Sequence, residues 1–312
     1  MKKISITAGC WNEVENIPLL YDRVKAVLAK FPEYDYEFVI ADNLSTDGTR
    51  DVLRQIAAKD PKFKVILNSN NFGHIRSPFN ALLNASGDAV VWMCSDLQEP
   101  PEVIEKFIHK WQEGCKVVAG VRSGTKASWL MECLRKCYYS LLAKSSSEAA
   151  VIPKFTGFGL YDRAVIEALK KFDDPYPYFR GLVSEIGFKR AEVPFIQDKR
   201  KHGKTKNNFF TLYDMAMTGF VNHTKLPLRL AVFSGFFIAF CSLLVALGYF
   251  IYKLCHWNSF QVGMAPLVIG LFFFSAIQLI FIGILGEYIG AIYTQVKKKP
   301  LVIEEERINF DE

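Results

Sequence analysis

Residues 36–48 read YEFVIADNLSTDG, and this stretch indicates the fold. YEFVIAD is rich in apolar and aromatic residues and predicts a buried strand, whereas NLSTDG is a polar turn that leads into a helix. Similar apolar runs occur at 4–9, 63–68 and 88–94. Segments with helical spacing lie at 14–30, 48–59 and 77–86, and Pro100-Pro101 opens a further helix. Such alternation of strands and helices predicts an α/β fold with a mostly parallel sheet.

Polar side chains follow each of the four apolar runs. They are Asn12 and Glu13, then Asp42 and Asn43, then Asn70 and Asn71, and finally Asp96, Gln98 and Glu99. One polar strand end is usually an ordinary turn or a helix cap. The carboxyl ends of parallel strands meet at one edge of a sheet, where ligands bind. Four polar ends in order therefore favour a shared binding site.

Two long apolar runs near the C-terminus predict a membrane anchor. LAVFSGFFIAFCSLLVALGYFIY spans 230–252 and MAPLVIGLFFFSAIQLIFIGILG spans 264–286, and neither contains a charged residue. Each is long enough to cross a hydrocarbon core of about 30 Å. Basic residues flank the pair on its outer sides, which predicts that both termini lie in the cytoplasm. The apolar-rich stretch 207–227 is expected to form an interfacial amphipathic helix before the first span.

Charge and cysteine content narrow the classes of function. The formal net charge is +6, and the first 229 residues carry a surplus of +7, which suits anionic partners such as phosphates or acidic lipid headgroups. No nucleic-acid-binding module is recognisable, so nucleic acid is not an expected partner. The seven cysteines are odd in number and lack zinc-site spacing, which argues against a disulfide framework or a zinc site. The two apolar runs argue against a wholly soluble enzyme.

Three motifs carry a resemblance to a known family. WNEVENI (11–17), ADNLSTDGT (41–49) and SDLQEPPE (95–102) resemble, in this order, the motifs of family 2 glycosyltransferases. The chain is similar more narrowly to polyisoprenyl-phosphate glycosyltransferases of the dolichyl-phosphate mannose synthase type, which have two C-terminal spans. Further matching segments are KRKHGKTK (199–206), TKLPLRL (224–230), GILGEYIGAIY (283–293) and KKKPL (297–301).

The resemblance implies an architecture and an activity. Residues 1–206 would form a cytoplasmic, Rossmann-like nucleotide-diphospho-sugar transferase domain of the GT-A type, residues 228–296 a two-helix transmembrane region, and residues 297–312 a cytoplasmic tail. The implied reaction transfers a sugar, with inversion, from a nucleotide sugar to undecaprenyl or dolichyl phosphate at the cytoplasmic face of the membrane. The expected donor is a UDP-sugar. A lipid phosphate is already an anionic nucleophile, so no strong general base is expected.

The resemblance also implies roles for individual residues. Expected donor-binding residues are Asn12, Glu13, Asp42, Asp96, Gln98, Arg200 and Lys206. Mg²⁺ or Mn²⁺ is the expected cofactor, with Asp96 and Gln98 as its protein ligands. Expected catalytic residues are Asp96, Arg122, Arg135 and Arg200, in which the arginines bind phosphate groups through their forked donors.

Five positions depart from the pattern of the family: Asn43, Cys94, Tyr139, Gly157 and Gly159. Cys94 stands where many relatives have an aspartate, and a thiol is a poor ligand for a hard cation. Gly157 and Gly159 replace an acidic or hydroxyl residue and an arginine, which suggests either close backbone approach or space for a larger sugar.

Other interpretations of the same residues remain open. Asp96 and Gln98 would also suit a cap of the Pro100 helix, Asp42 a turn, and Asn12 a helix cap. A second hypothesis is an enzyme that transfers the sugar to a hydroxyl of a glycan or glycolipid, with Asp173 or Asp174 as base. A third hypothesis is a non-catalytic, sugar-nucleotide-binding membrane scaffold. Glycines at 283, 286 and 290 have the helical spacing of packed spans, so a homo-oligomer is a further expectation.

Overall fold

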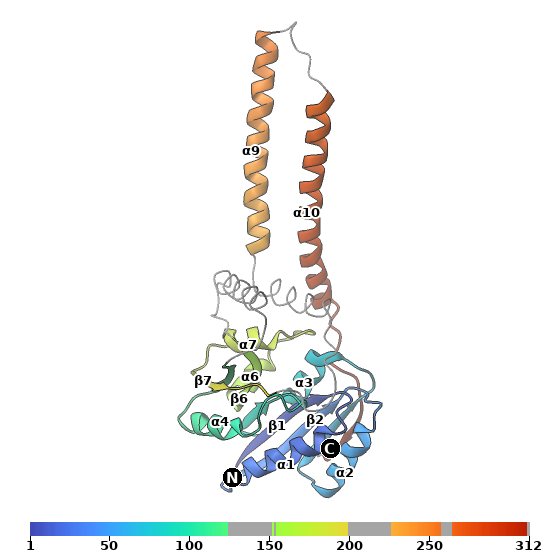
Figure 1. Cartoon of the computed structure of the whole chain (residues 1–312), viewed down its shortest axis with the longest axis vertical. Coiled ribbons are helices and arrows are strands. Elements are labelled where there is room, and N and C mark those ends of the chain that lie inside the picture. Colours follow the sequence, from blue (N-terminus) through green and yellow to red (C-terminus); the bar gives the residue numbers. More distant parts are fainter. Residues whose placement is uncertain (124–151, 153, 199–225, 257–263, 311–312) are drawn as a thin grey trace.

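The computed structural model describes residues 1–123, 152, 154–198, 226–256 and 264–310. These residues form an α/β domain from which two long helices project (Figure 1). In chain order the elements are β1 (Lys2–Cys10), α1 (Asn16–Leu28), β2 (Tyr34–Asp42), α2 (Thr49–Lys59), β3 (Phe63–Asn68), α3 (Gly73–Asn84), β4 (Ala89–Trp92), α4 (Val103–Gln112), β5 (Val117–Arg122), β6 (Phe155–Asp162), α6 (Arg163–Leu169), α7 (Phe179–Glu185), β7 (Arg190–Phe195), α9 (Leu226–Cys255), α10 (Met264–Val296) and β8 (Glu304–Ile308).

Within the described ranges, eight strands form one sheet in the order β7-β5-β6-β4-β1-β2-β3-β8. Its central strands β4, β1, β2 and β3 are parallel, as the alternation of strands and helices predicts. β6 runs antiparallel to both β4 and β5, and β8 runs antiparallel to β3. The sheet is therefore parallel at its centre and mixed at its flanks. The starts of β6 and β8 consequently lie at the same edge as the ends of the central strands.

Each face of the sheet carries its own hydrophobic core. Helices α1, α2 and α4 cover one face, where Ile17, Leu53 and Phe107 are fully buried. Helices α3, α6 and α7 cover the other face, with Phe79 and Phe179 in its core. Figure 1 shows α3 and α7 on the side of the domain from which α9 and α10 project. The domain therefore has three layers, one of which faces the long helices.

The four strands expected from the sequence are confirmed, and two of them are longer than expected. The third helix differs more, because α3 begins at Gly73 rather than near residue 77. The Asn71 side chain accepts a hydrogen bond from the Gly73 backbone N–H at 2.9 Å, which starts the helix directly after the polar turn. The turn after β3 is therefore short and holds the amide side chains close to the sheet edge.

Helices α9 and α10 contain two segments that are long and apolar enough to cross a membrane, Pro227–Tyr252 and Ile269–Val296. Many of their apolar side chains are exposed, including Phe236 at 73% and Phe272 at 70%, and so large an apolar surface is unfavourable in water. This composition indicates association with a membrane. Residues 207–225 of the expected interfacial helix lie outside the described residues.

The C-terminal segment differs from the expected tail. Residues 304–308 form β8, which pairs with β3 at the edge of the sheet. Ile308 packs against the core beneath α1 and α2, and the Asn309 side chain donates to the backbone oxygens of Ala57 at 2.8 Å and Phe63 at 2.9 Å. The α/β domain therefore includes a strand that follows the apolar helices and lies outside the expected bounds 1–206. Its acidic sequence suits an edge strand that has one face in solvent.

Candidate functional site

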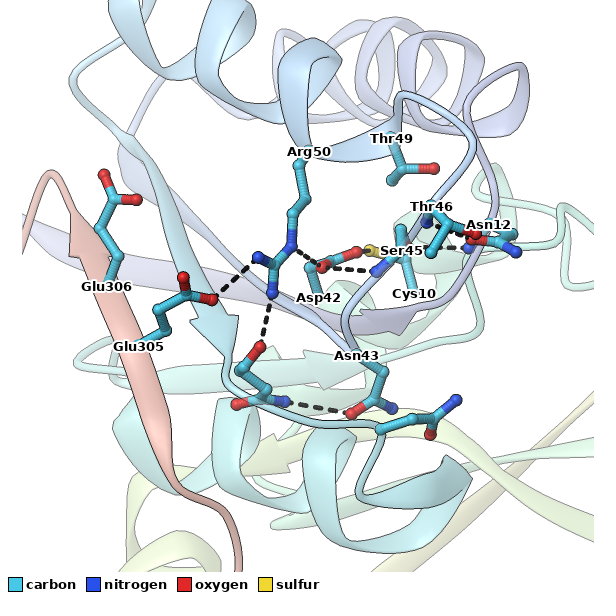
Figure 2. Close-up of polar contacts among 12 residues, drawn as sticks. Cys10, Asn12, Asp42, Asn43, Ser45, Thr46, Thr49, Arg50, Glu305 and Glu306 are labelled. Carbon is cyan, nitrogen blue, oxygen red and sulfur yellow. Dashed lines mark hydrogen bonds and ion pairs between the residues drawn. The ribbon is translucent and has the colours of Figure 1, made fainter.

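The loops that follow β1 and β2 form one hydrogen-bonded unit. The Asn12 backbone N–H donates to Ser45 Oγ at 2.9 Å, and Asn12 Oδ1 accepts from the Thr46 backbone N–H at 2.8 Å (Figure 2). The backbone N–H of Glu13 donates to Thr49 Oγ1 at 3.0 Å. Asn12 has φ = 56°, a left-handed conformation that asparagine tolerates better than most residues. The loop after β2 and the start of α2 therefore hold Asn12 and Glu13, in the loop after β1, in place.

Asp42 is fully buried and orders the second loop from within. Its Oδ2 accepts from the Ser45 backbone N–H at 3.1 Å and from Arg50 Nε at 2.8 Å. Its Oδ1 faces Cys10 Sγ at 3.8 Å, and burial together with the Asp42 charge raises the pKa of the Cys10 thiol well above its usual value. The turn-forming interpretation of Asp42 is thus confirmed, and its contact with a donor stays a prediction.

Asp47 and Gly48 form the start of α2. Asp47 Oδ1 accepts from the Thr49 backbone N–H at 3.0 Å, and Gly48 adopts φ = 93°, which only glycine adopts readily. Hydrogen bonds from Thr49 and Val14 lower the pKa of the Asp47 carboxyl against the opposing effect of its burial. Asp47 is therefore engaged in the turn, as its place before Gly48 predicts.

The loop after β4 presents Asp96 and Gln98 at the same sheet edge. Ser95 Oγ donates to the backbone oxygen of Gly9 at 2.9 Å, which fixes this loop against the end of β1. Asp96 Oδ1 accepts from the Gln98 backbone N–H at 3.2 Å, and both residues are half-buried. Cys94, at the position of the usual aspartate, is exposed beside them.

The oxygen atoms of this loop suit a divalent cation that is bound partly by the protein and partly by a substrate. Asp96 offers carboxylate oxygens and Gln98 an amide oxygen, which are ligand types that Mg²⁺ and Mn²⁺ accept. In the part of the chain that the structure describes, no group of three or more His, Cys, Asp or Glu side chains is arranged to hold a metal ion. A cation held by Asp96 and Gln98 would need further ligands, which Mg²⁺ commonly takes from water and phosphate oxygens.

Glu99 is a buried member of this loop that the sequence motifs contain but do not single out. Only 4% of its surface is exposed, and its carboxylate accepts from the Cys94 backbone N–H at 2.8 Å and from Thr156 Oγ1 at 2.9 Å. Burial raises the pKa of Glu99 to about 7, and the charge of Asp96 acts in the same direction. Those two hydrogen bonds and the Arg122 charge oppose this shift. Glu99 therefore links the β4 loop to β6 and titrates near neutrality.

Arg122 lies at the end of β5, on the β6 side of the same edge. Its side chain is half-buried, and its charge acts on Glu99, which indicates that it is near the β4 loop. The other expected basic residues, Arg135, Arg200 and Lys206, lie outside the described residues. At the sheet edge where the parallel strands end, the structure therefore brings together Asn12, Glu13 and the loop of Asp42. The adjacent part of the same edge holds Asp96, Gln98 and Arg122.

The two glycines on β6 have different structural causes. A Cβ atom added to Gly159 would lie 2.4 Å from the backbone oxygen of Val118, so β5 passes too close for any side chain. Gly157 has φ = 104°, a conformation that side-chain-bearing residues rarely adopt, and a Cβ atom added there would lie 3.5 Å from the Phe179 ring. Close backbone approach is thus confirmed at Gly159. The hypothesis of space for a larger sugar stays a prediction.

Asp173 and Asp174, the bases considered for a hydroxyl acceptor, are both engaged at the end of α10. Asp174 Oδ1 accepts from Gln295 Nε2 at 2.8 Å and from the Tyr176 backbone N–H at 2.9 Å. Asp173 Oδ2 lies 3.7 Å from Lys298 Nζ. These contacts join the α/β domain to the segment that leaves the second apolar helix.

Comparisons with known proteins agree with this geometry. The model of the family described as "Glycosyl transferase family 2" matches residues 5–167. An uncharacterized glycosyltransferase, YkcC of Bacillus subtilis, is 35% identical over 301 residues, covering 96% of this chain and 92% of its own. The SfII prophage-derived bactoprenol glucosyl transferase of Shigella flexneri is 32% identical over 301 residues, covering 96% and 97%.

Solved structures share the fold. Glucosyl-3-phosphoglycerate synthase from Mycobacterium tuberculosis, solved with Mn²⁺, UDP and glucosyl-3-phosphoglycerate, aligns with a TM-score of 0.51 and 18% identity. The alignment covers 70% of this chain and 78% of that protein. At this identity the likeness supports the fold of the α/β domain alone.

Proposed function

Because this chain belongs to glycosyl transferase family 2, we propose that it transfers a sugar from a nucleotide sugar to a polyisoprenyl phosphate. The observation that carries the proposal is the likeness to a bactoprenol glucosyl transferase over 96% of this chain, since that length includes both the α/β domain and the apolar helices. The proposed donor is a UDP-sugar, and the proposed acceptor is undecaprenyl or dolichyl phosphate.

The donor would occupy the edge formed by the ends of β1, β2 and β4. Asn12, Glu13 and the loop that Asp42 orders would receive the nucleoside, and the β4 loop would face the diphosphate. Asp96 and Gln98 would hold Mg²⁺ or Mn²⁺, which supplies Lewis-acid stabilisation of the leaving diphosphate. The pairing of UDP with Mn²⁺ in the glucosyl-3-phosphoglycerate synthase structure is compatible with this assignment.

The proposed reaction is a single displacement with inversion. An oxygen of the lipid phosphate attacks the anomeric carbon, and a carbon–oxygen bond forms while the bond to the diphosphate breaks. The nucleoside diphosphate leaves with the electron pair. The nucleophile is already anionic, so the protein contributes alignment and charge stabilisation rather than proton removal.

Arginine side chains suit the acceptor end of this reaction. Arg122, at the end of β5, would bind the lipid phosphate through two or more of its donors. We extend this assignment to Arg135, and we assign Arg200 and Lys206 to the donor diphosphate. The exposed apolar surfaces of α9 and α10 support a location at the membrane, and the flanking basic residues support a cytoplasmic orientation of the α/β domain.

A direct transfer assay tests the proposal. Purified full-length protein would be given labelled UDP-, GDP-, CDP- and dTDP-sugars, Mg²⁺ or Mn²⁺, and undecaprenyl or dolichyl phosphate in detergent. A glycolipid in which the sugar is linked through phosphate is the expected product. A product formed only with hydroxyl acceptors would show that the acceptor is a glycan or glycolipid hydroxyl and not a lipid phosphate. Donor binding without turnover under every condition would support a non-catalytic scaffold instead.

A further inference from the structure

Arg50 uses all three of its guanidinium nitrogens on the ends of three different strands. Its Nε donates to Asp42 Oδ2 at 2.8 Å, and one terminal nitrogen donates to the backbone oxygen of Asn68 at 2.5 Å. The other terminal nitrogen donates to Glu305 Oε2 at 2.9 Å (Figure 2). Asp42 ends β2, Asn68 ends β3, and Glu305 belongs to β8. A planar group with three fixed contacts has little freedom to rotate.

From Arg50, hydrogen bonds continue to both of the loops assigned to the donor nucleoside. The same Asp42 oxygen that accepts from Arg50 also accepts from the Ser45 backbone N–H, and Ser45 Oγ accepts from the Asn12 backbone N–H. The side chain of Asn12 in turn accepts from the Thr46 backbone N–H. The orientation of the Arg50 guanidinium is therefore transmitted to the backbone of both loops.

An irregularity in β8 brings Glu305 into this position. Glu306 pairs with Leu67, but the next pair along β3 joins Asn68 to Glu304, so Glu305 is an extra residue in a bulge. Consecutive side chains of a regular strand point to opposite faces, whereas a bulge can place both on one face. Glu305 and Glu306 both contact α2.

The chain between α10 and β8 is fastened along its length. The Arg76 side chain donates to the backbone oxygen of Pro300, and Ser69 donates to the backbone oxygen of Ile303 through both its backbone N–H and its hydroxyl, each at 3.0 Å. Only residues 297–303 separate the end of α10 from the start of β8. Displacement of the segment that leaves α10 would therefore move Glu305.

We propose that Arg50 is a positioning residue for the donor nucleoside, and that Glu305 of β8 helps to hold the Arg50 guanidinium in that position. The proposal rests on the proposed function, because it assigns the two loops to a nucleotide. Asp42 is fully buried, so its contact with Arg50 at 2.8 Å fixes the carboxylate that holds Ser45. The chain that has passed through the apolar helices thereby completes the site in the α/β domain.

The same two elements provide a matched control. Arg54 lies one helical turn after Arg50, and its terminal nitrogen contacts Glu306 Oε2 at 2.6 Å. This second pair also joins α2 to β8, with side chains that are 45% and 44% exposed. Its two charged groups pair with each other rather than with Asp42. Substitutions in the second pair therefore change the docking contacts of β8 without changing the contacts of the donor loops.

The test is nucleotide binding to the full-length protein in detergent, measured by calorimetry with UDP, GDP, CDP and dTDP. Arg50→Lys retains the charge but cannot keep three directed contacts, and we expect it to weaken the best-binding nucleotide about ten-fold, the effect of losing one or more charge-assisted hydrogen bonds. Glu305→Ala removes a half-exposed partner and should weaken binding about three-fold. Arg54→Lys and Glu306→Ala should bind as the wild type does.

A kinetic readout separates positioning from a general loss of structure. In the transfer assay, Arg50→Lys should raise the KM for the donor while the KM for the lipid phosphate stays unchanged. Equal effects of Arg50→Lys and Arg54→Lys on nucleotide binding would overturn the inference, as would an equal rise of both KM values. A wild-type protein that binds a nucleotide but glycosylates no polyisoprenyl phosphate would refute the proposed function and leave the inference standing. Failure to bind any of the four nucleotides would refute both.

Discussion

Replacement of Glu99 by glutamine is expected to stabilise the protein above neutral pH and to have little effect in acid. Glu99 is buried, and its carboxylate is held by two uncharged donors, the Cys94 backbone N–H and the Thr156 hydroxyl. Glutamine resembles the protonated acid, because its oxygen can accept from Cys94 and its amide can donate to Thr156 Oγ1. The substitution therefore keeps the shape and the hydrogen bonds and removes only the charge.

The magnitude follows from the pKa. Burial raises the pKa of Glu99 from 4.5 to about 7, which corresponds to about 3 kcal/mol at about 1.4 kcal/mol per pH unit. Between these two values the unfolded chain loses the proton while the folded protein keeps it. The free energy of unfolding of the wild type therefore falls as the pH rises from 4.5 towards 7, and the full cost is present above pH 7.

Thermal unfolding of the full-length protein between pH 4.5 and 8.5, in EDTA, measures this effect. The unfolding midpoints of wild type and Glu99→Gln should coincide near pH 4.5, and the variant should unfold roughly 5–10 °C higher at pH 8.5. Glu113→Gln is the control, because the Glu113 side chain is 57% exposed and a constant offset is expected. Parallel profiles for wild type and Glu99→Gln across this pH range would refute the reasoning.

Four further predictions concern the same sheet edge. Asp42→Asn should lower the free energy of unfolding by about 3 kcal/mol in thermal or chemical denaturation, because it removes the charge that compensates a largely buried guanidinium; an unchanged midpoint would contradict this. Asp96→Ala should abolish transfer with an unchanged unfolding midpoint, and near-normal turnover would remove Asp96 from the mechanism. Cys94→Asp should lower the Mn²⁺ concentration for half-maximal activity about ten-fold, since it adds one charged ligand; an identical metal titration would argue against a cation beside this position. Gly159→Ala should lower the free energy of unfolding by about 3 kcal/mol, because its Cβ would lie 2.4 Å from the Val118 backbone oxygen. A variant that denatures at the same midpoint as the wild type would show that β5 can move aside.

The centre of the fold follows from local sequence, and its flanks do not. YEFVIADNLSTDG predicts a buried strand and a turn because its apolar run and its Asp-Gly step act over a few residues. β8 gives no such signal, since EEER resembles a solvated segment. It becomes a strand only because β3 offers an unpaired edge and Ile308 finds a core position. Pairing between segments more than two hundred residues apart is not readable from either segment.

The candidate site shows the same division. The polar residues after β1, β2 and β4 were predictable, because parallel strands bring their carboxyl ends together whatever the details of packing. The role of Arg50 was not predictable, since an arginine on the first turn of an amphipathic helix usually points into water. Its role depends on a bulge in a strand that the sequence does not reveal. Burial of Glu99 is likewise set by β6, through the contact with Thr156.

The two buried carboxylates at this edge are held in opposite ways, and this difference separates their roles. Asp42 has a guanidinium at 2.8 Å, so its charge is compensated and fixes the geometry of the surrounding loops. Glu99 is held by uncharged donors and is strained electrostatically when ionised. A neutral isostere should therefore destabilise the protein at position 42 and stabilise it at position 99 above pH 7. The Glu99 carboxylate, whose ionisation costs stability, lies in the loop with Asp96 and Gln98, where the proposed reaction places the charge of the diphosphate. The Asp42 carboxylate, whose charge Arg50 compensates, lies in the loop that is proposed to orient the nucleoside.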